Sequence, residues 1–177
     1  LGPDELLDQL ARLGYPLTPE QLARTVDHYL ARTAHGSTLS RVVHASVLAR
    51  LEPARAWDLF RDALVADLDD TQGGTTAEGV HLGAMAGTID IVTRAFAGMD
   101  SHGDRLVFAP RLPDGVRGAT FRVHHRAQRI DVTLTHSRLR LAAAPMAGAA
   151  DLHVDVDGVP AVLPPGGTLD LPASGAR

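Results

Sequence analysis

Two hydroxyl-rich loops, each leading into an expected helix, carry the side chains of this chain that could do chemistry. The first loop runs over residues 33–40 and the second over residues 67–81. Their candidate ligand residues are His35, Gly36, Ser37 and Ser40 in the first loop and Gly74, Thr75 and His81 in the second. Backbone N–H groups at a helix start, glycines that let a ligand approach the backbone and nearby hydroxyl groups together favour a bound anion. The two loops therefore predict a site for phosphate or a carboxylate.

The same loops also have a purely structural interpretation. Thr75 and Glu78 are spaced as a capping box, in which Thr75 would begin a helix and Glu78 would complement the positive end of its dipole. Ser37 is similarly placed to cap the helix that follows the first loop. On this alternative both motifs would serve only to start helices, and the two interpretations stay open at this point.

Five helices are expected to position these loops. Their apolar periodicity places them over residues 3–13, 18–31, 37–51, 53–68 and 76–97. Thr18 and Gln21 form a capping box around Pro19, which suits the first helical position. The last helix contains Gly83 and Gly87, which would let a neighbouring backbone approach closely. The apolar side chains expected to face a core are Leu22, Val26, Tyr29, Leu30, Leu39, Val42, Val43, Leu48, Trp57, Phe60, Leu64 and Leu68.

Beyond the helices the periodicity changes to alternation. Short runs predict strands at residues 106–108, 120–124, 129–135, 138–141, 151–156, 161–163 and 168–171. Asp157 and Gly158 suit a tight hairpin turn, and the small residues of 142–150 predict a flexible connection. About six antiparallel strands favour a β-sandwich. The expected domains are residues 1–103 and 104–177, divided between Met99 and Asp104.

Composition excludes several classes of function. With 177 residues, 45% of them hydrophobic, the chain can form one large domain or two small ones around a core. It has no cysteine, and no spacing of its histidines and carboxylates predicts a metal or a cofactor. A net charge of −4 without a basic stripe argues against nucleic acid as a partner. No apolar run is as long as a membrane-spanning helix, which needs about 18 residues, and no signal peptide is visible. We therefore expect a cytoplasmic protein with no membrane contact.

The two loops, in this order, resemble the end of the catalytic domain of glycoside hydrolase family 65, which includes the maltose, trehalose and kojibiose phosphorylases. The resemblance continues through residues 96–99 and 106–113 and covers roughly residues 25–145. It implies an α+β fold in which the last helices of an (α/α)6 barrel precede a small antiparallel β-sandwich. It also implies that this chain, which begins with Leu1, is the C-terminal part of a longer enzyme.

The resemblance further implies an inverting phosphorolysis, in which inorganic phosphate attacks an α-glucoside to give β-glucose 1-phosphate and a sugar. Phosphate would then be a substrate held by the seven loop residues named above. The reaction also needs an acid that protonates the leaving oxygen. In the family this acid is a glutamate from an earlier part of the barrel, which this chain does not contain, so the chain alone is expected to be inactive.

Two alternatives remain open. In a family hydrolase that cleaves an α-glucoside such as trehalose with water, Glu78 would be the candidate base. In a non-catalytic assembly or carbohydrate-binding module, exposed aromatic rings would be expected, but only 4% of the residues are aromatic. Five helices cannot close a six-hairpin barrel, and their exposed apolar faces predict pairing with the N-terminal part of the same enzyme or with another copy. The sugar and its linkage are not predicted.

Overall fold

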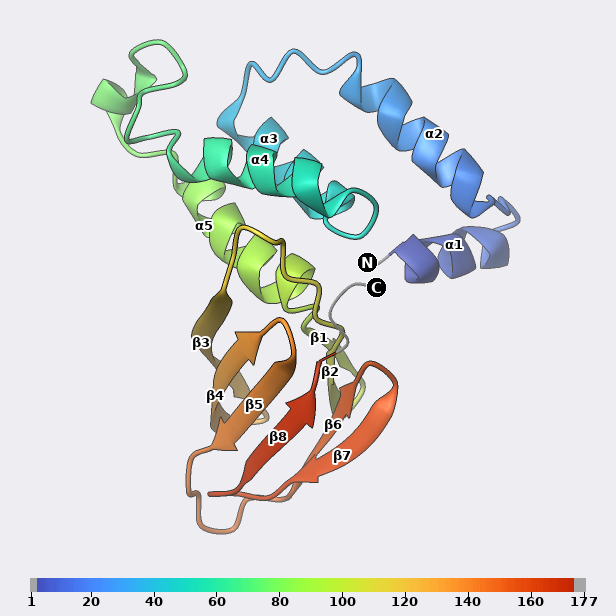
Figure 1. Cartoon of the computed structure of the whole chain (residues 1–177), viewed down its shortest axis with the longest axis vertical. Helices are drawn as coiled ribbons and strands as arrows, with labels where there is room; N and C mark the ends of the chain where they lie inside the picture. Colours follow the sequence, from blue (N-terminus) through green and yellow to red (C-terminus); the bar gives the residue numbers. More distant parts are fainter. Residues whose placement is uncertain (1–2, 174–177) are drawn as a thin grey trace. The chain divides into compact units, whose positions relative to one another are not determined.

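The computed structural model describes residues 3–173 of the chain (Figure 1). The chain divides between Thr88 and Ile89 into two compact units, a helical one and one made mostly of β-strands. Each unit is described by itself below.

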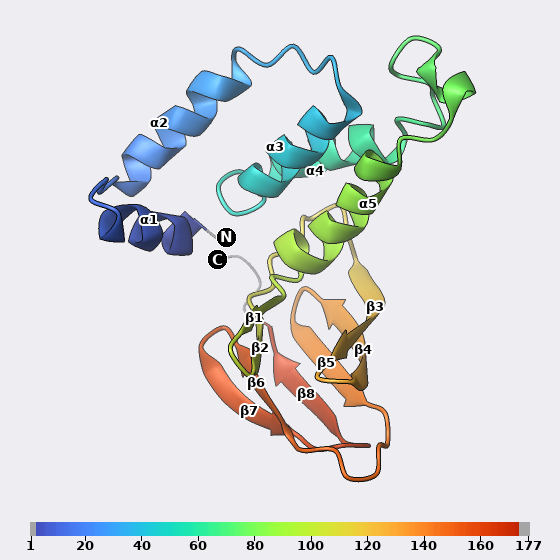
Figure 2. The same ribbon diagram turned by 180° about the vertical axis from the view of Figure 1, so that it is seen from behind.

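Four regular helices open the chain, as the periodicity predicts. They are α1 (Pro3–Arg12), α2 (Pro19–Leu30), α3 (Thr38–Leu48) and α4 (Pro53–Leu64). The predicted capping box before α2 is confirmed, because the Gln21 N–H donates to Thr18 Oγ1 and the Thr18 N–H donates to Gln21 Oε1. Helices α3 and α4 lie side by side (Figure 1, Figure 2). Buried alanines such as Ala45 and Ala56 let these two helices pack closely.

The predicted helix over residues 76–97 is wrong in its first turns. A 3₁₀ turn (η1, Thr75–Glu78) comes first, α5 (Leu82–Asp90) begins later, and a π-helical turn (η2, Ile91–Phe96) completes the segment. The break falls at Gly79, whose φ of 133° is reached at low cost only by glycine. Consequently Thr75 and Glu78 do not form the predicted capping box, and the residue before the 3₁₀ turn is Gly74 with a φ of 96°.

The predicted core of the helical unit is confirmed only in part. Leu22, Leu30, Val42, Leu48 and Phe60 are buried. The residues predicted to face the core that are instead exposed are Tyr29, Leu39, Val43, Leu64 and Leu68. Tyr29 and Val43 border an open groove between α2 and α3, and Leu68 lies in turns beyond the end of α4.

The second unit is a sandwich of two four-stranded sheets (Figure 2). Its strands are β1 (Asp100–His102), β2 (Arg105–Phe108), β3 (Gly118–His125), β4 (Gln128–Thr135), β5 (Arg138–Ala143), β6 (Leu152–Val156), β7 (Val159–Leu163) and β8 (Thr168–Pro172). One sheet has the order β1-β2-β6-β7 and the other β3-β4-β5-β8. The predicted sandwich is therefore confirmed, with β1 as an additional strand.

The sandwich departs from the prediction in two details. Strands β2 and β6 pair in parallel, with Leu106 opposite Val154, whereas the sequence predicted antiparallel pairing throughout. The segment 142–150, predicted to be a flexible connection, begins as strand, because Ala142 pairs with Thr168 and the Ala143 N–H donates to the carbonyl of Gly167. Small side chains do not prevent a strand when both neighbours supply backbone partners.

Alternating side chains fill the space between the two sheets. In β4, Ile130, Val132 and Leu134 are fully buried, and Phe108 and Val154 of the other sheet are also fully buried. The sequence predicts a division between residues 99 and 104, whereas the compact units part earlier. The reason is that η2 is tied to the β unit, since the Arg111 N–H donates to the carbonyl of Phe96 at 2.7 Å.

Candidate functional site

The first candidate loop is held by hydrogen bonds within itself. Ser37 caps α3, because its Oγ accepts from the Leu39 N–H at 3.3 Å. Ser40 Oγ donates to the carbonyl of Ser37 at 2.8 Å and also lies 3.0 Å from His35 Nδ1. Since the Ser40 hydroxyl proton points to the Ser37 carbonyl, His35 donates through Nδ1. The His35 Nε2 is thus the ring nitrogen that can meet a ligand.

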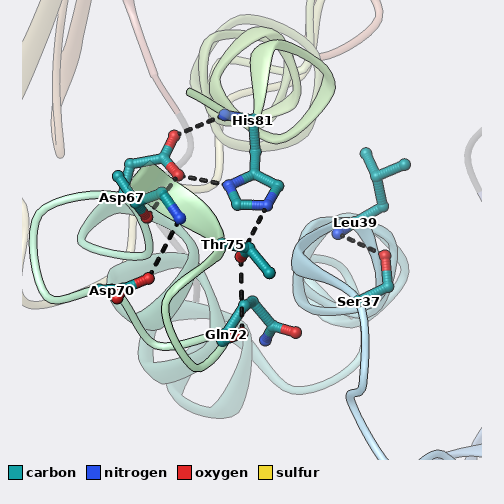
Figure 3. Close-up of polar contacts among 8 residues, drawn as sticks. Ser37, Leu39, Asp67, Asp70, Gln72, Thr75 and His81 are labelled. Carbon is teal, nitrogen blue, oxygen red and sulfur yellow. Dashed lines mark hydrogen bonds and ion pairs between the residues drawn. The ribbon is translucent and has the colours of Figure 1, made fainter. Parts of the chain in front are cut away.

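The second candidate loop is organised around a buried carboxylate (Figure 3). Asp67 Oδ2 accepts the backbone N–H of His81 at 2.9 Å, and Asp67 Oδ1 lies 2.5 Å from His81 Nδ1. On the other side of the ring, His81 Nε2 lies 3.3 Å from Thr75 Oγ1. The Asp67 side chain is 9% exposed and that of His81 is 27% exposed. The imidazole is therefore held between a carboxylate and a hydroxyl group.

A glutamine links the two loops. The Gln72 amide is oriented so that both of its polar atoms are hydrogen-bonded. Its nitrogen donates to the Gly36 carbonyl at 3.1 Å, and its oxygen accepts from Arg41 Nη1 at 3.1 Å. In Figure 3, Ser37 at the start of α3 lies across from Gln72 and Thr75. The structure therefore brings the two loops together within the helical unit, and it adds the cationic Arg41 at their junction.

Sequence reasoning missed Asp67, Gln72 and Arg41. Gln72 and Arg41 lie close to the predicted motifs, but their types alone do not distinguish them from ordinary surface residues. Asp67 follows the apolar run of α4, and a carboxylate before a glycine-rich loop is a weak signal. Glu78, the candidate base of the hydrolase alternative, is exposed in the 3₁₀ turn.

The start of α5 offers less to an anion than the sequence predicts. Asp67 already accepts the N–H of His81, the residue immediately before the helix, so its charge complements the positive end of the dipole. This half of the site therefore presents side-chain groups of Thr75 and His81 rather than a free helix end. The start of α3, in contrast, is capped by the neutral Ser37.

The hydrogen bond from the His81 ring holds the pKa of the Asp67 carboxyl below its ordinary value. The backbone N–H of His81 and the Thr76 hydroxyl act in the same direction, while burial opposes them. Because the folded-state pKa is lowered, the stability contributed by this carboxylate is complete above the ordinary carboxyl pKa. It is lost as the pH falls through the lower, folded-state value.

His44 is expected to give the helical unit a pH-dependent stability. Burial, and then the neighbouring His35 and Arg55, lower the pKa of His44. Its Nδ1 is closed to solvent and has no hydrogen-bond partner among the described residues. A lowered folded-state pKa means that the stability due to neutral His44 is present above the ordinary imidazole pKa and is lost on acidification below it.

We therefore expect His44→Leu to reduce the loss of thermal stability between about pH 7.5 and about pH 5.5, a range that spans the ordinary imidazole pKa. The melting temperature would be followed through the fluorescence of Trp57, the single tryptophan of the sequence. His28→Leu, which replaces an exposed histidine of α2, is the matched control and should keep the wild-type pH dependence. An unchanged pH dependence in His44→Leu would contradict the expectation.

Among the described side chains, which are those of residues 6–173, no three His, Asp or Glu gather as a metal ion would require. The helices of this same part of the chain include none that is both long and apolar enough to span a bilayer.

Helices joined by two polar loops, followed by an antiparallel-rich sandwich, define an α+β class of protein in which a helical region precedes a β domain. The profile of the glycosyl hydrolase family 65 central catalytic domain matches residues 4–90. The profile of the glycosyl hydrolase family 65 C-terminal domain matches residues 99–163. The chain belongs to glycosyl hydrolase family 65, which confirms the resemblance seen in its two loops.

Individual relatives agree with this family. An uncharacterized glycosyl hydrolase of Mycobacterium tuberculosis is 46% identical over 81% of this chain and 11% of its own length. The trehalose 6-phosphate phosphorylase of Lactococcus lactis is 35% identical over 81% of this chain and 19% of its own length. The maltose phosphorylase of Bacillus subtilis is 32% identical over 82% of this chain and 19% of its own length. The chain thus spans less than a fifth of these curated relatives.

The fold also matches a solved structure from the human microbiome that is provisionally named a kojibiose phosphorylase. The TM-score is 0.75 at 20% sequence identity, with 91% of this chain and 23% of that chain covered. This likeness shows the fold of helices followed by a small sandwich.

Proposed function

We propose that this chain forms the phosphate-binding C-terminal part of an inverting disaccharide phosphorylase, which converts an α-glucoside and phosphate to β-glucose 1-phosphate and a sugar. The observation that carries the proposal is the junction at Gln72, whose amide bonds to the Gly36 carbonyl and to Arg41. This junction ties the loop of His35 to the loop of His81, and Arg41 supplies a positive charge there. The names of the trehalose 6-phosphate and maltose phosphorylases among the relatives support the same reaction.

The chemistry of the junction suits phosphate better than water. Phosphate is already a nucleophile, so its site needs hydrogen-bond donors and positive charge rather than a base. The junction offers the hydroxyl groups of Ser37 and Thr75 together with the Arg41 guanidinium, while the Ser40 hydroxyl donates to the Ser37 carbonyl.

Two nearby carboxylates are already hydrogen-bonded, because Asp67 accepts from the two N–H groups of His81 and Asp70 accepts from the Thr76 N–H. They are therefore less repulsive to an anion than bare carboxylates would be. A third carboxylate, Asp62, lies 3.9 Å from Arg41 Nε.

The remaining groups of the reaction lie outside this chain in our proposal. The acid that protonates the leaving sugar and the pocket for the disaccharide would come from the N-terminal part of the same enzyme. The exposed apolar side chains of the described helices, such as Tyr29 and Val43, fit a surface that this part or a second copy covers. On this proposal the chain by itself binds phosphate but cleaves no disaccharide, and no cofactor takes part.

Isothermal titration calorimetry of the 177-residue chain with inorganic phosphate tests the proposal. Saturable binding is expected, and Ser37→Ala and Thr75→Ala should each weaken it roughly two- to tenfold, the range for loss of one hydrogen bond. Ser46→Ala, which changes an exposed serine farther along α3, is the matched control and should bind as the wild type does. Absence of phosphate binding would contradict the proposal.

The enzyme that contains this chain gives the second arm of the test. Turnover that rises from near zero with added phosphate and yields glucose 1-phosphate would support the phosphorylase. Phosphate-independent release of free glucose would instead support the hydrolase, with Glu78 as its candidate base. Turnover that neither Ser37→Ala nor Thr75→Ala affects would support an assembly role for this chain.

A further inference from the structure

We propose that Asp67 is a positioning residue that fixes the orientation and the proton arrangement of the His81 ring, so that Nε2 is the nitrogen presented to phosphate. This inference rests on the proposed phosphate-binding function. No pattern in the sequence assigned a role to Asp67, and the role follows from the contacts of its two carboxylate oxygens.

The first contact fixes the position of the carboxylate. Asp67 Oδ2 accepts the backbone N–H of His81 at 2.9 Å. A backbone N–H can only donate, and its place is set by the start of α5, so this oxygen cannot exchange roles with another group. Thr76 adds a weaker contact, because its Oγ1 lies 3.5 Å from Asp67 Oδ1.

The second contact fixes the imidazole. With Oδ2 held by the backbone, Oδ1 faces His81 Nδ1. An ionised carboxylate accepts hydrogen bonds and donates none, so Nδ1 must carry a proton. A neutral ring then has its lone pair on Nε2, whose neighbour at 3.3 Å is Thr75 Oγ1. Fixing one ring nitrogen through the hydrogen bond of the other is the way in which proteins set the roles of a histidine.

The arrangement gives His81 a defined interaction with phosphate. A neutral ring accepts a hydrogen bond at Nε2 from the Thr75 hydroxyl or from a protonated phosphate oxygen. A protonated ring donates from Nε2 to a phosphate oxygen, and its charge is balanced by Asp67 behind it. In both protonation states His81 Nε2 contacts the phosphate, and the imidazole ring lies between the phosphate and the Asp67 carboxylate. The low exposure of Asp67, 9% against 27% for His81, agrees with a carboxylate that acts through the ring.

Nitrogen NMR of the His81 ring in the 177-residue chain tests the assignment. In the wild type we expect a proton on Nδ1 and a lone pair on Nε2, and the Nε2 resonance should shift when inorganic phosphate is added. Asp67→Asn presents one oxygen and one NH₂ group. With the oxygen on the backbone N–H of His81, the NH₂ group faces Nδ1, so the proton should move to Nε2. The neutral ring should then no longer accept a hydrogen bond from a protonated phosphate oxygen.

Asp69→Asn is the matched control, because it neutralises an exposed carboxylate of the same turn. It should leave both the proton arrangement and the phosphate affinity as in the wild type. A merely structural role of Asp67 would lower stability without inverting the ring protons, so the spectrum separates the two roles. If Asp67→Asn does not fold, the wild-type spectrum alone still decides.

The proton arrangement of the His81 ring and its response to phosphate can be read separately. A wild-type His81 ring protonated on Nε2 rather than Nδ1 would overturn the assignment of Asp67 even if phosphate binds. A ring protonated on Nδ1 that phosphate does not perturb would overturn the proposed function and leave the effect of Asp67 on the ring standing.

Discussion

Phe108→Ala is expected to lower the free energy of unfolding of the β unit by about 3–5 kcal/mol, the range for removing a buried phenylalanine. Phe108 is fully buried in the core between the two sheets. Truncation to alanine removes its apolar contacts and leaves a cavity. The measurement is denaturant unfolding of the chain followed by the circular dichroism of its strands. A loss this large is a substantial part of the stability of an ordinary domain.

Val162→Ala in β7 is the control for this change. Its side chain is 47% exposed, so the same kind of truncation removes less buried surface. We expect a change below about 1 kcal/mol, as for most substitutions of exposed residues. Equal losses in the two variants would contradict the placement of Phe108 in the core.

Two glycine-to-alanine changes in α5 are expected to have opposite effects. A Cβ at Gly87 would lie 2.3 Å from Val42 Cγ1, and Val42 is itself buried. Overpacking of this kind costs about 1–3 kcal/mol, which outweighs the up to about 1 kcal/mol that alanine gains over glycine in a helix. Gly87→Ala should therefore destabilise the helical unit.

Gly83→Ala is the matched change. Its Cβ would meet Leu39 Cδ2 at 3.3 Å, and Leu39 is 49% exposed and can move. The helix-propensity gain should then prevail, giving a change between zero and about 1 kcal/mol of stabilisation. Denaturant unfolding followed by Trp57 fluorescence measures both variants. If Gly83→Ala destabilised the helical unit as much as Gly87→Ala does, the contacts of the added Cβ with Leu39 and Val42 would not determine the change in stability.

Local patterns predicted the parts of the fold whose causes are local. The capping box of Thr18 and Gln21 and the cap at Ser37 depend on residues within one turn, and both are present. The strand over Gln128–Thr135 follows from strict alternation of apolar and polar residues. The parallel pairing of β2 with β6 was not predictable in this way, because no property of either strand alone distinguishes parallel from antiparallel partners.

The candidate site shows the same limit. The sequence identified the loops of His35 and Thr75, but it predicted that Thr75 and Glu78 begin a helix. The structure begins α5 later because Asp67, fourteen positions before His81, takes the backbone N–H of that residue. A competition between a local capping box and a distant carboxylate is decided by tertiary contacts, and these were not visible in the spacing of the motif.

The order of the strands has a consequence for how the β unit acquires its structure during synthesis. Strands β1 and β2 belong to one sheet, the chain then builds β3, β4 and β5 of the other, and β6 and β7 return to the first. Strand β2 must therefore wait for β6 while the three strands between them form a meander from neighbouring hairpins. A two-stranded hairpin is at best marginally stable alone, and pairing between distant segments is slow. As the chain leaves the ribosome, both sheets thus stay incomplete until late strands are made: the first until β6 and β7, and the second until β8.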